Sequence, residues 1–293
     1  MNDPDWLARR FEENRIHLQS VAYRMLGSSS EADDAVQEAW LRLRRADTSD
    51  VRNLRGWLTT VVARVSLDML RSGKARREER LDTAVPDSTV GGDEAGDPER
   101  EAVLAESVGL ALLVVLDTLA PAERLAFVLH DMFDVPFDEI APIVGRSPTA
   151  ARQLASRARR RVRGAPTIPE VELGRQRKVV DAFLAALRGG DFEGLIAVLD
   201  PDLVVRADFA AAAGASREVH GAQVWARQAL AFSQHARFAR TALVNGDVGV
   251  VMAPRGRLFR VLRLTITRGR IARIDVVTDP AGLSQLDLAV FDG

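Results

Sequence analysis

Residues 137–163, FDEIAPIVGRSPTAARQLASRARRRVR, contain the pattern that decides the fold of this chain. Four apolar residues recur there at helical spacing and form one stripe: Phe137, Ile140, Ala141 and Val144. Gly145 is typical of a helix end, and Ser147 followed by Pro148 is typical of the cap and first position of a new helix. The spacing predicts a helix-turn-helix. Because Pro142 removes a backbone donor, we expect the first helix to be short or bent.

The second of these helices has one apolar and one basic face. The inward residues are Ala151, Leu154, Ala155, Ala158 and Val162, and the outward ones are Arg152, Gln153, Ser156, Arg157, Arg160 and Arg161. No acidic residue occurs between Arg146 and Arg163, so this face projects a positive field. Phosphate is the natural counter-charge, and Arg and Gln can read base edges. The alternative is a solvated basic helix in a bundle, but ordinary exposed helices mix charges of both signs.

Composition narrows the classes of protein that fit. The chain has 293 residues, 47% of them hydrophobic but only 5% aromatic, so we expect two or three domains with aliphatic cores. The net charge of −1 hides a segregation of charge, since residues 82–106 carry eight acids against the single Arg100. Without cysteine there is no disulfide or thiolate metal site, and we expect no cofactor and a cytoplasmic location. The charged N-terminus and the short apolar run 108–116 predict neither signal peptide nor membrane span.

The pattern along the chain predicts four parts. Residues 1–80 are expected to form three helices, at about 6–26, 31–45 and 53–72. Residues 81–100, rich in Gly, Pro and acids, are typical of a linker. Residues 101–164 are expected to be helical and to end in the helix-turn-helix, and a Gly- and Pro-containing boundary at 164–169 follows.

Residues 165–293 predict an α+β domain, a curved sheet wrapped around helices. Helices are expected at about 173–188, 192–199 and 222–232, and strands at about 203–209, 240–244, 248–252, 258–267 and 271–278. Asn245-Gly246-Asp247 and Arg268-Gly269-Arg270 are typical of hairpin turns. Apolar and polar residues alternate over 262–267, as a sheet with one dry face requires.

The first 163 residues resemble a known family. Tyr23–Gly27, Ala32–Glu38, Leu54–Leu58 and Asp68–Arg71 are similar to the sigma-2 domain of extracytoplasmic-function sigma factors. The second helical part is similar to sigma-4 at Leu119, Pro121, Glu123, Arg124, Glu139–Ala141 and Arg157–Arg159. The remainder resembles the SnoaL-like domain, a cone-shaped NTF2-like fold, which one subgroup of these factors carries at its C-terminus. The resemblance implies a factor that binds core RNA polymerase, recognises the −35 and −10 promoter elements and promotes initiation.

The resemblance also assigns candidate residues. Docking on the coiled coil of the largest catalytic subunit of the polymerase maps to Asp33, Asp34, Gln37, Glu38, Leu41 and Arg42, and the polymerase flap is a further expected contact. Recognition of the −10 element maps to the loop 47–53 and the helix after it, at Asp47, Ser49, Asp50, Arg52, Asn53, Arg55 and Arg64. For the −35 element we expect Arg152, Gln153, Ser156 and Arg157 near base edges and Arg146, Thr149, Arg160 and Arg161 on phosphates.

The role of the C-terminal domain stays open between several hypotheses. Relatives of its fold include enzymes, and a cone pocket could contain Asp208, Trp225 and Asp275, but no spacing singles out a catalytic pair. We therefore expect a non-enzymatic domain that contacts the sigma domains of its own chain and modulates their activity. The rival hypothesis is a ligand-sensing repressor with a SnoaL-like sensor, and a third is a cyclase or isomerase.

Overall fold

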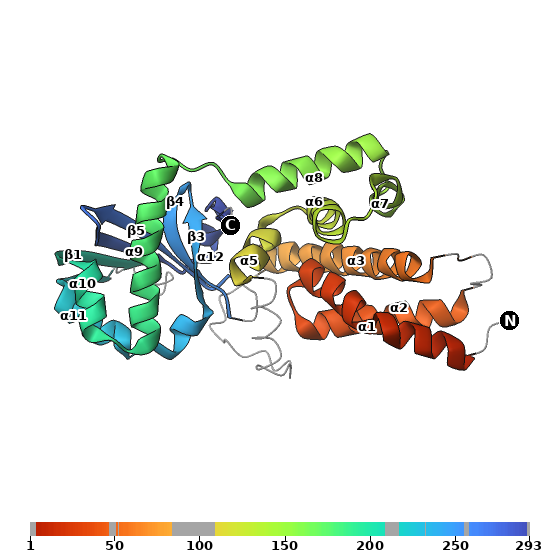
Figure 1. Cartoon of the computed structure of the whole chain (residues 1–293), viewed down its shortest axis with the longest axis horizontal. Coiled ribbons are helices and arrows are strands. Elements are labelled where there is room, and N and C mark those ends of the chain that lie inside the picture. Colours follow the sequence, from red (N-terminus) through yellow and green to blue (C-terminus); the bar gives the residue numbers. More distant parts are fainter. Residues whose placement is uncertain are drawn as a thin grey trace. The chain divides into compact units, whose positions relative to one another are not determined.

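The computed structural model describes residues 4–46, 51, 53–83, 109–208, 217–231, 233–254 and 258–291, with the backbone alone for residues 4, 74–83, 208, 217, 234 and 235. The chain forms two compact units, and Figure 1 labels most of their helices and strands. The first unit comprises Met1–Val108 with Leu119–Arg159, and the second Gly109–Thr118 with Arg160–Gly293. These units differ from the expected boundaries, because residues 109–118 and the end of the helix-turn-helix cluster with the C-terminal part. The expected acidic linker, 81–100, lies almost wholly outside the described residues.

Three helices open the first unit, as expected: α1 (Pro4–Leu26), α2 (Ser29–Arg45) and α3 (Leu54–Thr83). Gly27 ends α1 with a φ of +76°, a conformation that glycine adopts without strain. Ser28 begins α2 because its hydroxyl accepts a hydrogen bond from the backbone amide of Glu31 at 3.3 Å. The helices pack on one another in all three pairings around buried apolar side chains, among them Leu18, Val21, Met25, Val36, Leu58 and Val62.

The second helical set of this unit comprises α6 (Pro121–Phe127), one π-helical stretch η1 (Val128–Met132), α7 (Phe137–Val144) and the greater part of α8 (Pro148–Arg163). Helices α6 and α7 both pack against α3. Arg124 of α6 is 2% exposed, and its Nε donates to the backbone carbonyl of Arg24 at 3.0 Å. This guanidinium therefore satisfies a carbonyl in the last turn of α1, where helix carbonyls lack partners within the helix.

The second unit is built on a sheet, and seven strands belong to it within the described residues. They run in the order β2 (Arg217–His220), β1 (Leu199–Asp208), β6 (Arg270–Val277), β5 (Arg260–Thr267), β4 (Asp247–Met252), β3 (Ala239–Val244) and β7 (Leu288–Ala289). Only β1 and β6 pair in parallel, and the remaining neighbours are antiparallel. The two expected hairpin turns join β3 to β4 and β5 to β6.

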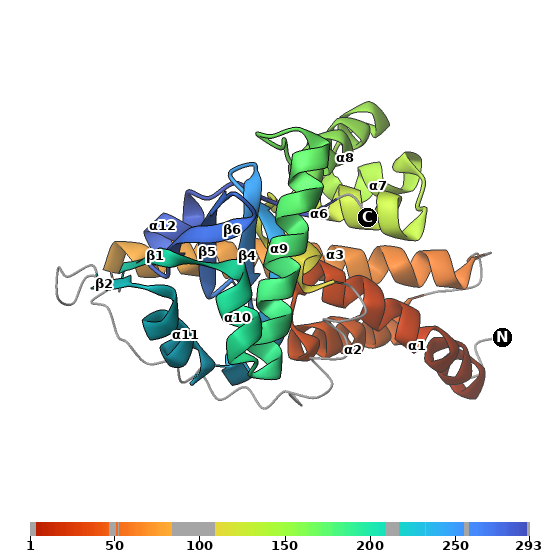
Figure 2. The ribbon, with the colours of Figure 1, turned by 60° about the vertical axis from the view of Figure 1, so that its left-hand side comes forward.

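Helices α9 (Glu170–Gly189), α10 (Phe192–Val198) and α11 (Ala222–Leu230) lie on one face of this sheet (Figure 2). Together they bury a core that includes Val180, Phe183, Leu195, Leu203, Val250 and Ile274. Two short elements, η2 (Ser233–Phe238) and α12 (Pro280–Ser284), complete the unit together with α5. The expected fold class, helical domains followed by an α+β domain, is confirmed.

The apolar helix α5 (Leu110–Thr118) packs against β3 and β7. Five of its nine residues are buried: Leu110, Leu113, Val114, Val115 and Leu116. Leu243 of β3 belongs to the core under α9 to α11, so its neighbours Ala242 and Val244 point to the other face of the sheet. Ala242 and Val244 are buried too, so that face of β3 is also covered. The sequence led us to expect this helix in the same domain as the helix-turn-helix, and the structure instead groups it with the C-terminal sheet.

Candidate nucleic-acid interface

The helix-turn-helix has the geometry that its sequence predicts. Gly145 follows α7 in the left-handed region, with φ of +67°, and the hydroxyl of Ser147 accepts a hydrogen bond from the amide of Ala150 at 3.2 Å. Pro148 is the first residue of α8. Helix α7 is only eight residues long and holds Pro142 in its interior, in agreement with the expectation of a short helix.

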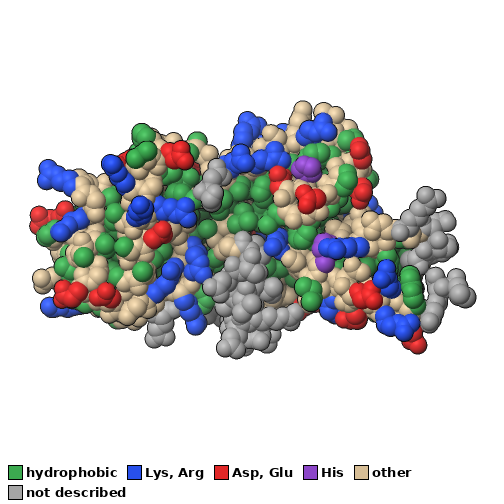
Figure 3. All heavy atoms as spheres, viewed as in Figure 1, with side chains coloured by type: hydrophobic (Ala, Val, Ile, Leu, Met, Phe, Trp, Pro, Cys, Tyr) green, Lys and Arg blue, Asp and Glu red, His purple; other side chains and the backbone are tan. Residues whose placement is uncertain are grey.

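Helix α8 separates its faces as expected. Its small apolar residues are buried: Ala151, Ala155, Ala158 and Val162. Seven of the eight residues assigned to the −35 element are exposed, and these are Arg146, Thr149, Arg152, Gln153, Arg157, Arg160 and Arg161. Ser156 is half-buried. Basic side chains gather over this helix in Figure 3, so the helix presents cations and hydrogen-bond donors at one surface.

Some of these arginines already have partners. The Nε of Arg157 lies 3.0 Å from Oε1 of Glu123, whose side chain is 11% exposed. The guanidinium of Arg152 lies over the ring of Phe137, 5.3 Å from its centroid. Arg159, on the side of the helix, pairs with Asp131 at 2.7 Å. Arg157 is therefore held near α6, which leaves Arg152 and Gln153 as the better placed candidates for base contacts.

The residues assigned to the −10 element are described only in part. Asp47, Ser49, Asp50 and Arg52 lie outside the described residues. Asn53 has a structural function, since its Oδ1 accepts a hydrogen bond from the amide of Gly56 at 3.0 Å at the start of α3. Arg64 is exposed on α3.

Arg55 takes part in a short hydrogen-bond network that the sequence did not reveal. Its Nη2 lies 3.1 Å from Nδ1 of His17, and Nε2 of His17 lies 2.9 Å from Oγ1 of Thr59. A guanidinium can only donate, so Nδ1 accepts and His17 is neutral in this arrangement. Burial, and then the charge of Arg55, lower the pKa of His17 below its ordinary value. The ring also meets Phe133 edge-on, with centroids 5.3 Å apart.

The polymerase candidates lie along α2, and they differ in exposure. Asp34 and Gln37 are exposed, while Leu41 is half-buried. Asp33 accepts a hydrogen bond from Gln19 at 2.8 Å, and Glu38 pairs with Arg42 at 2.9 Å. Asp34 and Gln37 therefore offer the most accessible polar groups of this set.

Of the three residues expected in a cone pocket, the two with described side chains, Trp225 and Asp275, do not lie on the same face of the sheet. Trp225 stacks on Phe183 of the apolar core, with ring centroids 5.8 Å apart. Asp275 follows the core residue Ile274 on β6 and so points to the opposite face of the sheet. The side chain of Asp208 lies outside the described residues. Because side chains alternate between the two faces along β6, Asp275 does not share a pocket with Trp225, and that expectation is corrected.

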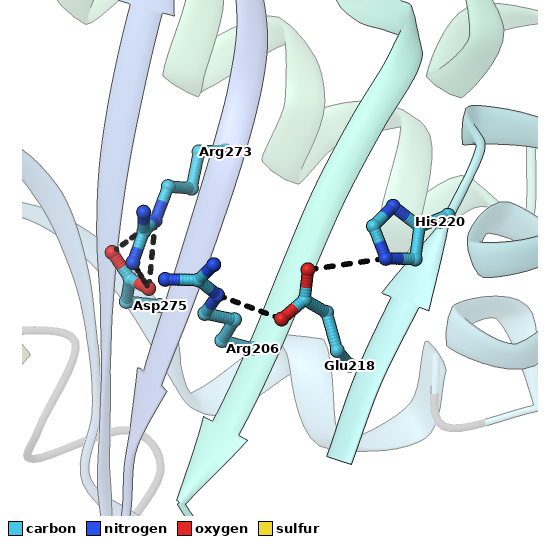
Figure 4. Close-up of polar contacts among 5 residues, drawn as sticks. All are labelled: Arg206, Glu218, His220, Arg273 and Asp275. Atoms are coloured by element: carbon cyan, nitrogen blue, oxygen red, sulfur yellow. Dashed lines mark hydrogen bonds and ion pairs between the residues drawn. The ribbon is translucent and has the colours of Figure 1, made fainter. Parts of the chain in front are cut away.

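On that opposite face Asp275 forms an ion pair beside a second, separate group of charged side chains, and Figure 4 shows both. Arg273 holds both carboxylate oxygens of Asp275 at 2.7–2.9 Å. Arg206 pairs with Glu218 at 2.9 Å, and Glu218 also lies 3.1 Å from His220. These groups satisfy one another across β2, β1 and β6, as expected for a solvated sheet surface.

A helix-turn-helix with an exposed basic helix, in a chain with a second set of helices, is the arrangement of a DNA-binding protein. Two family models match the same parts of the chain: Sigma-70 region 2 over residues 10–77 and Sigma-70, region 4 over residues 109–162. The second match includes α5, although the structure groups that helix with the C-terminal sheet.

Two relatives match more than nine tenths of the chain. The chain is 39% identical to ECF RNA polymerase sigma factor SigJ of Mycobacterium tuberculosis, over 92% of this chain and 91% of that protein. It is 35% identical to the probable ECF sigma factor SigI of the same species, over 98% of both. The chain therefore belongs to the ECF RNA polymerase sigma factor family.

The crystal structure of Mycobacterium tuberculosis SigJ covers 94% of this chain and 97% of its own, with 36% identity and a TM-score of 0.46. An NTF2-like protein of unknown function from Cytophaga hutchinsonii covers 37% of this chain and 93% of its own, with 14% identity and a TM-score of 0.26. In the part of the chain that the structure describes, no helix combines the length and the apolar composition of a membrane span.

Proposed function

We propose that this sigma factor binds core RNA polymerase through α2, recognises the −35 element with α8 and the −10 element with the loop 47–53 and the start of α3, and so promotes initiation in the cytoplasm. The observation that carries the proposal is the exposed basic face of α8, set by a helix-turn-helix in a chain of this family. The expected polymerase contacts are the coiled coil of the largest catalytic subunit and the flap.

The recognition helix is tested by removing its best placed side chains. Arg152→Ala and Gln153→Ala should each weaken binding of the holoenzyme to a promoter selected from a random library about tenfold, because a lost bidentate base contact costs about 1–3 kcal/mol. Arg175→Ala is the matched control, since it removes an arginine side chain that is 74% exposed on a different helix, α9. If all three variants bind the promoter equally well, the proposal that α8 recognises the promoter is contradicted.

The polymerase contact is tested by reversing a charge. Asp34→Arg should lower co-purification with core polymerase about tenfold, because it puts a cation on a face expected to meet basic residues. Glu193→Arg makes the same change at an exposed site on α10 and should have no effect. If both variants co-purify like the original chain, the docking surface lies elsewhere.

The C-terminal domain is proposed to modulate the sigma domains of its own chain. Its core is formed by apolar residues, and Asp275 lies among ion pairs on the opposite face, which gives no support to an acid or base in a pocket. A ligand-sensing repressor would bind its DNA tightly without polymerase. A gel shift with and without core polymerase separates the two functions, and tight specific binding by the isolated chain would favour the repressor.

A further inference from the structure

The last turn of the recognition helix is bonded to the end of the chain. The backbone amide of Val290 donates to the carbonyl of Val162 at 2.8 Å, and the amide of Gly164 donates to the carbonyls of Arg160 and Arg161 at 3.0 and 3.2 Å. Val162 and the neighbouring Ala289 are 6% and 2% exposed. We name this contact, made by Val162, Gly164, Ala289 and Val290, the tail joint.

The tail joint depends on glycine at position 164. Gly164 adopts φ of +64°, and a Cβ built there would overlap the Cβ of Ala289 and lie 3.6 Å from Cδ1 of Leu243. The backbone of the helix exit therefore approaches β7 more closely than any side chain permits. Further contacts hold the tail at this place.

Those contacts fasten the tail to β3 and the turn after it. Leu288 and Ala289 pair with Val244 and Leu243. Asp287 and Asn245 form two hydrogen bonds. The backbone amide of Asn245 donates to the carbonyl of Asp287 at 2.7 Å, and the amide of Asp287 donates to Oδ1 of Asn245 at 2.9 Å.

The segment after α8 is fastened at the same place, because the amide of Thr167 donates to the carbonyl of Gly246 at 3.1 Å. Residues 164–169, which the sequence suggests are a simple boundary, are thus bound to the β3–β4 hairpin. The segment that follows the last turn of α8 is therefore hydrogen-bonded to the same hairpin as the tail.

We propose that the tail joint keeps the last turn of α8 ordered and thereby supports the phosphate contacts of Arg160 and Arg161. The inference rests on the proposed function of α8. The last carbonyls of a helix lack partners within the helix, and helix ends fray. Val290 supplies a partner to one of these carbonyls within one turn of both arginines. In this respect the C-terminal domain strengthens DNA binding by the recognition helix.

The test uses the full chain with two matched glycine variants. Gly164→Ala forces the tail away, whereas Gly190→Ala places the same substitution at φ of +67° with nothing within 4 Å of the new Cβ. Val290→Pro is a second variant, which removes the donor without touching α8. Hydrogen exchange of peptides covering 158–166 and 285–291 reports whether the joint opens. Fluorescence anisotropy with a 20-base-pair duplex of random sequence reports phosphate binding at low salt.

Gly164→Ala and Val290→Pro should both raise exchange in these peptides and weaken duplex binding at least threefold relative to Gly190→Ala. The affinity of these two variants for the duplex should also fall less steeply with salt concentration, by the slope that corresponds to about one to two lost phosphate contacts. The inference is overturned if exchange does not rise in either variant, if exchange rises while binding stays unchanged, or if the original chain binds no duplex. Co-purification with core polymerase, measured on the same variants, should persist. If the original chain does not co-purify with core polymerase, the proposed function is contradicted. The inference about the tail joint is then still tested by duplex binding.

Discussion

At the scale of single residues, partners far apart in sequence decide which arginines of α8 are available. Arg157 and Glu123 are 34 positions apart and form an ion pair, with side-chain exposures of 51% and 11%. Because the arginine is half exposed, water screens the pair and its contribution to stability is modest. The main consequence is orientation, since Glu123 directs Arg157 toward α6.

A double-mutant cycle measures this pair. Glu123→Gln and Arg157→Gln should each lower the free energy of unfolding by about 1 kcal/mol, and the double variant should lose little more than either alone, because a partly exposed pair contributes about 0.2–1 kcal/mol. Urea unfolding of the four proteins gives the coupling. Strictly additive losses would show that the two side chains do not interact in solution.

The short-range features of the interface were predictable from sequence. The turn and the start of α8 depend on the local conformational preferences of three residues within a span of four, namely Gly145, Ser147 and Pro148. The partners of Arg157 and of His17 were not predictable, because nothing local indicates which distant element packs on them. The expected cone pocket of Asp208, Trp225 and Asp275 does not include Asp275, since the strand that holds Asp275 turns its side chain away from the core.

At the scale of elements, the network of His17 joins α1 to α3 and couples the first unit to pH. Burial and the charge of Arg55 lower the pKa of His17 in the folded chain below the ordinary value of 6.5. Above pH 6.5 the ring is neutral in both states and costs nothing. As the pH falls below 6.5 the unfolded chain takes up the proton first, so the stability of the folded chain declines.

Replacement of this histidine should flatten that decline. His17→Gln keeps a donor for Thr59 and cannot titrate, so its free energy of unfolding should fall less between pH 7 and pH 5 than that of the original chain. Urea unfolding at several pH values measures the difference. A parallel decline in both proteins would show that His17 is not the titrating group. His220→Gln, on the sheet surface beside Glu218, serves as the control for a different histidine.

Elements with strong local patterns were predicted well, and elements that depend on pairing were not. The turns Asn245-Gly246 and Arg268-Gly269 place residues with positive φ where the hairpins need them, and both hairpins were expected. The four-residue strand β2 and the two-residue strand β7 have too few residues for a period to show. Helix α5 was expected, but an apolar sequence does not indicate which of two cores it joins.

At the scale of the whole molecule, the modules defined by family models and the compact units of the structure do not coincide. Region 4 begins at residue 109 by sequence, whereas residues 109–118 pack with the C-terminal sheet. A chain ending after Gly164 would therefore keep α5 and lose β3 and β7, its packing partners.

Such a truncated chain should fail to hold α5 as a protected helix. The lost burial of its five apolar side chains corresponds to on the order of 5 kcal/mol. Hydrogen exchange in a peptide covering 110–118 should be much faster in the truncated chain than in full length, while a peptide from α3 covering 54–70 should be unchanged. Equal protection of α5 in both chains would contradict its assignment to the second unit.

The most direct test of the account is co-purification of the full chain with core RNA polymerase at low salt. We expect retention of the original chain and of Glu193→Arg, and a marked loss for Asp34→Arg. If the original chain does not associate with the polymerase under these conditions, the proposed function is contradicted.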